Sequence, residues 1–192
     1  RYVGEAKFLR AFQYFDLVKN FGGVPLVMGM KMPAEIEGIQ RASVPEVYAK
    51  IEDDLKDAIE VLPLKSEYGS ADLGRATKGA AQGMLAKVYL YQEKYEEAED
   101  LLQRVIGRNN YPSQGYELLK DFGNVWSIAY NNSEESLFEV QTSSDISYNL
   151  GLRMPVVCGS RDDSGWAWGL PTSDLENAFK NAGDEIRLQW TI

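Results

Sequence analysis

Four amphipathic helical segments, arranged as two successive pairs, constrain this sequence most strongly. The first, residues 5–21, places Phe8, Phe12 and Phe15 at three- and four-residue spacings, and Gly22-Gly23 ends it. The other three are predicted over residues 43–62, 77–93 and 95–106, each with apolar side chains along one face. Apolar faces of this kind must pack against one another, so the pattern predicts helical hairpins.

The predicted helix ends carry recognisable capping signals. Ser43 with Glu46 three residues later forms the pattern of a capping box, and Pro63 stops that helix. Thr77 is placed to cap the third helix, and Gly107 follows the fourth. These signals fix the helix boundaries independently of the hydrophobic pattern.

Small and aromatic residues recur in both pairs. Ala86 and Tyr89 precede Ala98 by 12 and 9 positions, which is the spacing of a tetratricopeptide repeat of about 34 residues. Ala11 and Tyr14 repeat the first half, but Tyr14 lies 37 positions before its counterpart Ile51, so the first repeat contains 28 extra residues. Two unrelated amphipathic hairpins could match this degenerate pattern by coincidence, and helical pairing is predicted in either case.

The remaining segments are less regular. Residues 24–40 are predicted to be an irregular excursion between helices, residues 116–122 a short helix, and residues 137–141 a strand or extended piece. Gly, Ser, Asp and Asn then accumulate up to residue 165, and a last helix is predicted over residues 171–179 with no element after it. The predicted class is mainly α, with a helical tetratricopeptide-like scaffold over 1–123 and a loop-rich part over 124–192.

Charge and composition exclude several classes of function. The formal net charge is −9, which argues against a nucleic-acid partner, and no apolar run reaches the roughly 18 to 20 residues of a membrane-spanning helix. The chain has no histidine, the usual general base and the commonest zinc ligand. Its one cysteine, Cys158, is predicted to be a small buried side chain. No cofactor is expected.

Trp166 and Trp168 are the most suggestive candidates for ligand binding. Aromatic faces stack on the C–H surfaces of sugar rings, and alternate residues of an extended strand share one face. A buried structural pair would follow from the same spacing, so this alternative stays open. The preceding loop supplies side chains suited to sugar recognition, namely Tyr148, Asn149, Arg161 and Asp162.

Acidic residues do not form a recognisable catalytic or metal site. Asp162-Asp163 and Glu134-Glu135 are adjacent in sequence, whereas glycoside hydrolysis needs two opposed carboxylates. The aspartates also lack the regular ligand spacing of a calcium hand. We therefore predict neither a catalytic nor a metal-binding residue, and we interpret Glu5, Arg10, Arg75 and Lys78 as surface or inter-helix ion pairs.

Eight blocks of the chain, in order, are similar to the SusD/RagB family of outer-membrane nutrient-binding lipoproteins. They are residues 5–11 (EAKFLRA), 14–15 (YF), 21–27 (FGGVPLV), 41–48 (RASVPEVY), 74–81 (GRATKGAA), 85–90 (LAKVYL), 136–141 (SLFEVQ) and 171–175 (PTSDL). Together they span nearly the whole chain.

The resemblance implies a non-catalytic cell-surface protein that binds oligosaccharides or polysaccharides and delivers them to a TonB-dependent SusC-like transporter. It implies localisation at the extracellular face of the outer membrane through a lipid anchor that lies outside this segment. Residues 1–192 are accordingly expected to be a fragment of one larger SusD-like domain. The alternatives are a tetratricopeptide-type protein-interaction adaptor and, resting only on loop carboxylates, a sugar-cleaving enzyme.

Overall fold

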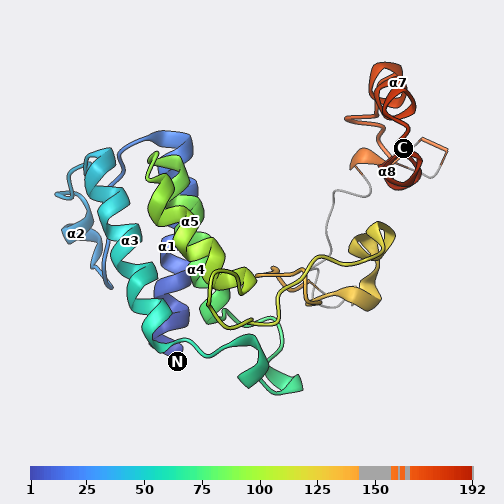
Figure 1. Ribbon diagram of the computed structural model, residues 1–192. Helices are drawn as coiled ribbons and strands as arrows, with labels where there is room; N and C mark the ends of the chain where they lie inside the picture. The colour runs from blue at the N-terminus through green and yellow to red at the C-terminus, as the bar shows by residue number, and fades with distance from the viewer. Residues whose placement is uncertain (143–156, 160, 163–164, 192) are drawn as a thin grey trace. The chain divides into compact units, whose positions relative to one another are not determined.

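The computed structural model describes residues 1–142, 157–159, 161–162 and 165–191 (Figure 1). The chain divides into two compact units. Unit 1 comprises Arg1–Leu118 with Glu134–Phe138, and unit 2 comprises Leu119–Ser133 with Glu139–Ile192.

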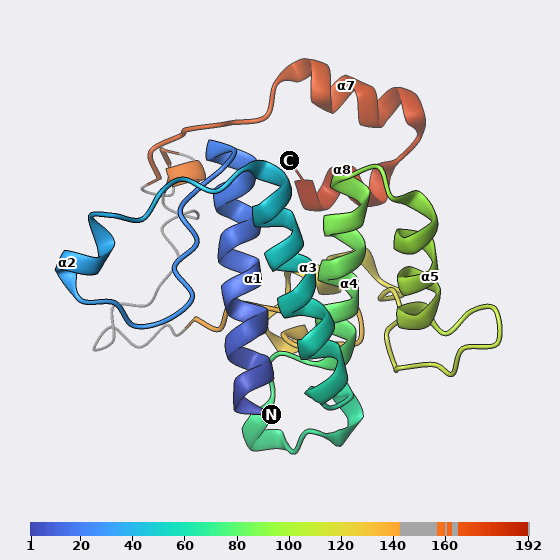
Figure 2. The same cartoon turned by 90° about the vertical axis from the view of Figure 1, so that its left-hand side faces the viewer.

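Unit 1 is built from four long helices in two hairpins. They are α1 (Tyr2–Phe21), α3 (Val44–Val61), α4 (Lys78–Tyr91) and α5 (Tyr95–Ile106). Figure 2 shows α1, α3, α4 and α5 side by side, with each helix packed on the next. The mainly α, tetratricopeptide-like prediction is confirmed, although α1 begins three residues earlier than predicted.

The core of unit 1 lies along the predicted apolar faces. Phe8, Ala11 and Phe15 of α1 are almost fully buried, as are Val47, Ile51, Leu55 and Ala58 of α3. In α4 the small residues Ala80, Ala81 and Ala86 are buried, and the absence of bulky side chains there lets neighbouring helices approach closely. The helix caps form as predicted, since Ser43 accepts from the Glu46 amide and Thr77 from the Ala80 amide.

The two ends of the insertion between α1 and α3 lie next to each other. An isolated bridge joins Pro25 to Arg41, and the Ala42 amide donates to the Val24 carbonyl at 3.1 Å. Between these ends lies the short helix α2 (Pro33–Ile36). Two further short helical turns, η1 (Lys65–Glu67) and η2 (Ser70–Asp72), connect α3 to α4.

One of the two predictions for the segment after α5 is wrong. Residues 116–121 are not helical, because Tyr116 is buried and its hydroxyl lies 2.7 Å from Thr77 Oγ1 at the start of α4, and a helical turn begins only at Phe122. Of the strand or extended piece predicted for residues 137–141, the strand is absent, and Phe138 packs edge-on against Phe8, with ring centroids 4.9 Å apart. At Tyr116 the tertiary contact of a single aromatic side chain overrides the local helical propensity.

Unit 2 contains shorter helices: η3 (Phe122–Trp126), η4 (Ile128–Tyr130), α7 (Ser173–Ala182) and α8 (Glu185–Thr191). Thr172 caps α7 by accepting from the Leu175 amide, and α8 was not anticipated from the sequence. It packs on η3, where a Cβ at Gly123 would lie 2.3 Å from the Trp190 ring. In the described part of the chain, every helix is too short or too polar to cross a bilayer.

Two buried carboxylates tie α3 to its neighbours on opposite sides. Asp54 is fully buried and accepts from Arg10 of α1 through both oxygens, each at 2.7 Å, and from Lys50 at 2.8 Å. Glu52 accepts from Gln92 at 2.9 Å and from Lys94 at 2.6 Å, both in the α4–α5 connection. Burial alone would raise the pKa of Asp54, but the hydrogen bonds from Arg10 and Lys50 outweigh burial and lower this pKa below its ordinary value.

We predict that Asp54→Asn lowers the free energy of unfolding by about 2–3 kcal/mol at pH 7, because it leaves the guanidinium of Arg10 without its anion. Urea denaturation measures the change. Asp53→Asn, at an exposed neighbouring position on α3, should change stability by less than about 0.5 kcal/mol.

The same pair of proteins tests the pKa of Asp54. A depressed folded-state pKa stabilises the fold above the unfolded value of about 3.9, and this contribution disappears as pH falls through the folded pKa. The difference between wild type and Asp54→Asn should therefore be constant above about pH 5 and shrink below about pH 4. A difference that stays unchanged at pH 3 would contradict the assignment.

Candidate functional site

Trp166 and Trp168 lie together on the surface of unit 2. Their ring centroids are 5.6 Å apart at an interplanar angle of 61°, and the residues are 52% and 64% exposed. The predicted strand geometry is wrong, because Ala167 between them has φ 57°, in the left-handed region. The left-handed residue turns the chain, so the two indoles meet edge to face instead of projecting in parallel.

The indole pair is held by backbone contacts to a short preceding segment. The Ala167 amide donates to the Gly159 carbonyl at 3.0 Å, and the Trp168 amide donates to the Val157 carbonyl at 2.9 Å. Gly165 approaches this segment so closely that a Cβ there would lie 2.1 Å from the Gly159 oxygen. The pair therefore sits on a turn held by two backbone hydrogen bonds. The close approach of residue 165 to the Gly159 carbonyl leaves room only for glycine at position 165.

The other predicted ligand residues are only partly described. Arg161 and Asp162 are exposed and follow the segment that holds the indole pair. Tyr148 and Asn149 lie outside the described residues. Cys158 is exposed, contrary to the prediction of a buried side chain.

Charged residues of the family-like blocks serve structure. Glu5 of α1 pairs with the Arg75 guanidinium ahead of α4, and Arg10 pairs with Asp54. Asn132 lies in a turn, and its side-chain amide exchanges hydrogen bonds of 3.0 Å with the Gln141 side chain. The described residues include no cluster of three or more acidic or cysteine side chains suited to a metal ion.

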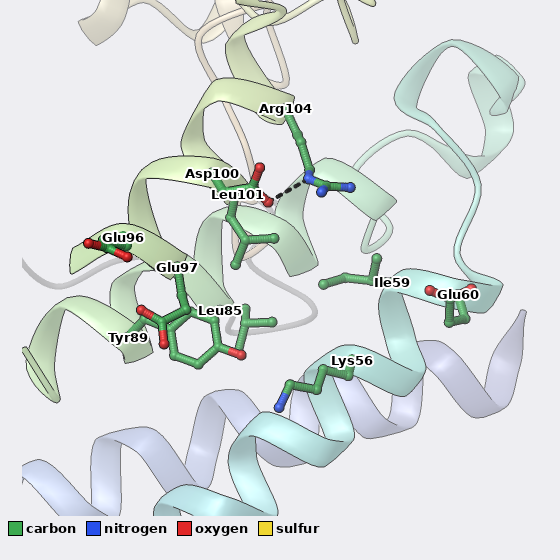
Figure 3. Close-up of a pocket in the computed structure, with 10 residues that line it drawn as sticks. All are labelled: Lys56, Ile59, Glu60, Leu85, Tyr89, Glu96, Glu97, Asp100, Leu101 and Arg104. Carbon is green, nitrogen blue, oxygen red and sulfur yellow. Dashed lines mark hydrogen bonds and ion pairs between the residues drawn. The ribbon is translucent and has the colours of Figure 1, made fainter. Parts of the chain in front are cut away.

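A groove in unit 1 was not anticipated from the sequence. It has a volume of about 620 Å³ and runs between α3 and α5 above α4 (Figure 3). Its lining is Lys56, Ile59, Glu60, Leu85, Tyr89, Glu96, Glu97, Asp100, Leu101 and Arg104. Figure 3 shows Ile59, Leu85 and Leu101 directed into the space between the helices. The helical periodicity of the sequence places Leu85 and Leu101 on faces that pack against other helices. The acidic residues beside them were the only sequence feature that indicated an open surface.

The two basic side chains of the groove are already paired. Lys56 lies 3.2 Å from Glu52, and Arg104 Nε lies 2.9 Å from Asp100. The hydrogen bond from the Tyr111 hydroxyl, followed by that from Arg104, lowers the pKa of Asp100. Arg104 also borders a second cavity of about 470 Å³ that contains Lys78, Gln82 and Gln114. Within the described chain, Gln114 Oε1 is buried without a hydrogen-bond partner.

Comparison with known proteins shows which family and which relatives this chain is similar to. Residues 1–90 match a family described as starch-binding and associating with the outer membrane. SusD-like protein P2 of Formosa agariphila is 33% identical over 88% of this chain and 34% of its own length. A SusD-like protein of Bacteroides ovatus is 29% identical over 72% of this chain and 26% of its own length. The chain thus spans about a third or less of these relatives.

Solved structures give the same likeness. A laminarin binding SusD-like protein is similar with a TM-score of 0.83 and 30% identity, over 94% of this chain and 43% of that protein. A SusD-like protein from Bacteroides fragilis is similar with a TM-score of 0.75 and 35% identity, over 91% of this chain and 34% of that protein.

The exposure of Cys158 gives a direct test of the turn that carries the indole pair. We predict that Ellman's reagent modifies one thiol per chain in the native protein, because the sulfur atom lies at the surface. Cys158→Ser provides the zero-thiol control. Modification that occurs only after guanidinium unfolding would contradict this placement.

Proposed function

Because the chain belongs to the SusD-like family, we propose that the protein is a non-catalytic glycan-binding protein of the cell surface. In this proposal it captures oligosaccharides or polysaccharides and passes them to a TonB-dependent SusC-like transporter of the outer membrane. The protein is held at the extracellular face of that membrane by a lipid anchor outside the segment described above. The family's description as starch-binding and associated with the outer membrane supports both the ligand class and the location.

The observation that carries the proposal is the exposed pair of indoles. A residue that serves only the core is normally covered, whereas Trp166 and Trp168 each leave more than half of their surface to solvent. An indole face excludes water from the C–H side of a pyranose ring, while neighbouring polar groups bind its hydroxyls. Arg161 and Asp162 are exposed polar side chains that precede Trp166 by five and four positions.

The loop-rich part of the chain, 124–192, is therefore the proposed ligand-facing part, and residues 1–123 its scaffold. Tyr148 and Asn149 complete the proposed ligand set with Trp166, Trp168, Arg161 and Asp162. The proposal assigns them binding and no bond cleavage. Hydrolysis of a glycosidic bond requires two carboxylates on opposite sides of it, and Asp162 alone supplies one.

A β-glucan of the laminarin type is the first ligand to test, because the similar laminarin binding SusD-like protein covers 94% of this chain. The experiment is isothermal titration of the protein with laminarin oligosaccharides and with a panel of starch-type, plant and host glycans. Failure to bind any member of the panel would contradict the proposed function.

We predict that Trp166→Ala and Trp168→Ala each weaken binding of the recognised glycan about tenfold, because each removes one stacking face. Trp126→Ala is the matched control, since Trp126 is also in unit 2 and is 63% exposed. It should leave the affinity unchanged. Equal affinities for all three variants and wild type would show that the indole pair does not bind the ligand.

A further inference from the structure

The groove between α3, α4 and α5 differs chemically from the indole pair. Its floor is aliphatic, formed by Ile59, Leu85 and Leu101, of which Leu85 belongs to the buried core. Its one aromatic residue, Tyr89, is only 9% exposed, and the Lys94 and Lys56 ammonium nitrogens lie 5.3 and 5.9 Å from the ring centroid. The ring is thus almost fully covered and close to two cations, so it offers little open face for a sugar to stack on.

Charge on the groove is unbalanced. Its lining contains four acidic residues and two basic ones, and the two basic side chains already bind Glu52 and Asp100. Glu60 of α3 and Glu96 and Glu97 of α5 are exposed and have no ion-pair partner within the described parts of the chain. Carboxylates thus stand on both rims of an aliphatic floor, with their charge uncompensated.

From this combination we infer that the groove binds a polypeptide segment in which a lysine or arginine adjoins an aliphatic side chain. The aliphatic side chain displaces water from Ile59, Leu85 and Leu101, and the cationic group pairs with a carboxylate on one rim, Glu60 of α3 or Glu97 of α5. A glycan, whose surface carries many hydroxyl groups, would bury little apolar area on this floor. The methylene stem of lysine or arginine is aliphatic and can pack on it. The partner is therefore a protein with a basic, partly apolar segment.

This site is independent of the proposed glycan function. All its residues belong to unit 1, whereas Trp166 and Trp168 belong to unit 2. Chemistry also separates the two surfaces, because one offers open aromatic faces and the other offers aliphatic side chains between carboxylates. Each can therefore be tested without the other.

The experiment measures fluorescence anisotropy of a labelled peptide, Gly-Ser-Leu-Lys-Leu-Ser-Gly, as the protein is added at low ionic strength. We expect saturable binding that weakens with salt and is lost when the lysine is acetylated, because acetylation removes the cationic charge. In the bound state, the methyl signals of Ile59, Leu85 and Leu101 should shift in the NMR spectrum.

Two double variants assign the binding to the groove. Glu60→Gln/Glu97→Gln should weaken the peptide about tenfold by removing both proposed partners of the lysine. Asp53→Asn/Glu117→Gln removes the same charge from exposed positions of unit 1 outside the groove and should leave the affinity within about twofold, since these carboxylates do not pair with the peptide.

Three results would overturn the inference: no binding of the peptide at millimolar concentration, equal affinity for the acetylated peptide, or equal losses in the two double variants. Saturating laminarin oligosaccharide should not change the peptide affinity. If the peptide fails to bind while glycan titration succeeds, the groove assignment falls and the proposed function stands.

Discussion

The packing of α1 against α3 is the interaction on which the rest of unit 1 depends. Phe8, Ala11 and Phe15 form one face of this contact, and α3 supplies the aliphatic side chains opposite. With α3 fixed, its two buried carboxylates reach α1 on one side and the α4–α5 connection on the other. Because α3 and α5 are thereby both positioned on α4, the groove between them follows from the same packing.

The helical part of this fold could be predicted because the sequence signals that specify each helix lie within that helix or at its ends. The spacing of Phe8 and Phe15, the capping box at Ser43 and the cap at Thr77 each concern residues within one helix or at its end. The 28-residue insertion was also predictable, because it interrupts a repeat whose two halves remain intact. The structure adds that one bridge between Pro25 and Arg41 closes it.

The candidate site could not be predicted to the same extent, because its geometry depends on single residues and tertiary contacts. A left-handed Ala167 brings the two indoles together, and nothing in its sequence neighbourhood indicates that conformation. Tyr116 leaves its expected helix because its hydroxyl finds a partner far away in sequence, Thr77, and Phe138 likewise packs on the distant Phe8. The groove could not be predicted because Leu85 and Leu101 have the sequence pattern of ordinary core residues. The open space beside them exists only in the assembled helices.

The central claim is that glycan is bound at the indole pair of unit 2. The four tryptophans, Trp126, Trp166, Trp168 and Trp190, give four indole N–H signals in a ¹H–¹⁵N NMR spectrum, so one titration reports on all of them. With the glycan that the protein recognises, the account predicts shifts of the Trp166 and Trp168 signals and little change at Trp126 and Trp190. Shifts confined to Trp126 or Trp190, with Trp166 and Trp168 unmoved, would contradict it.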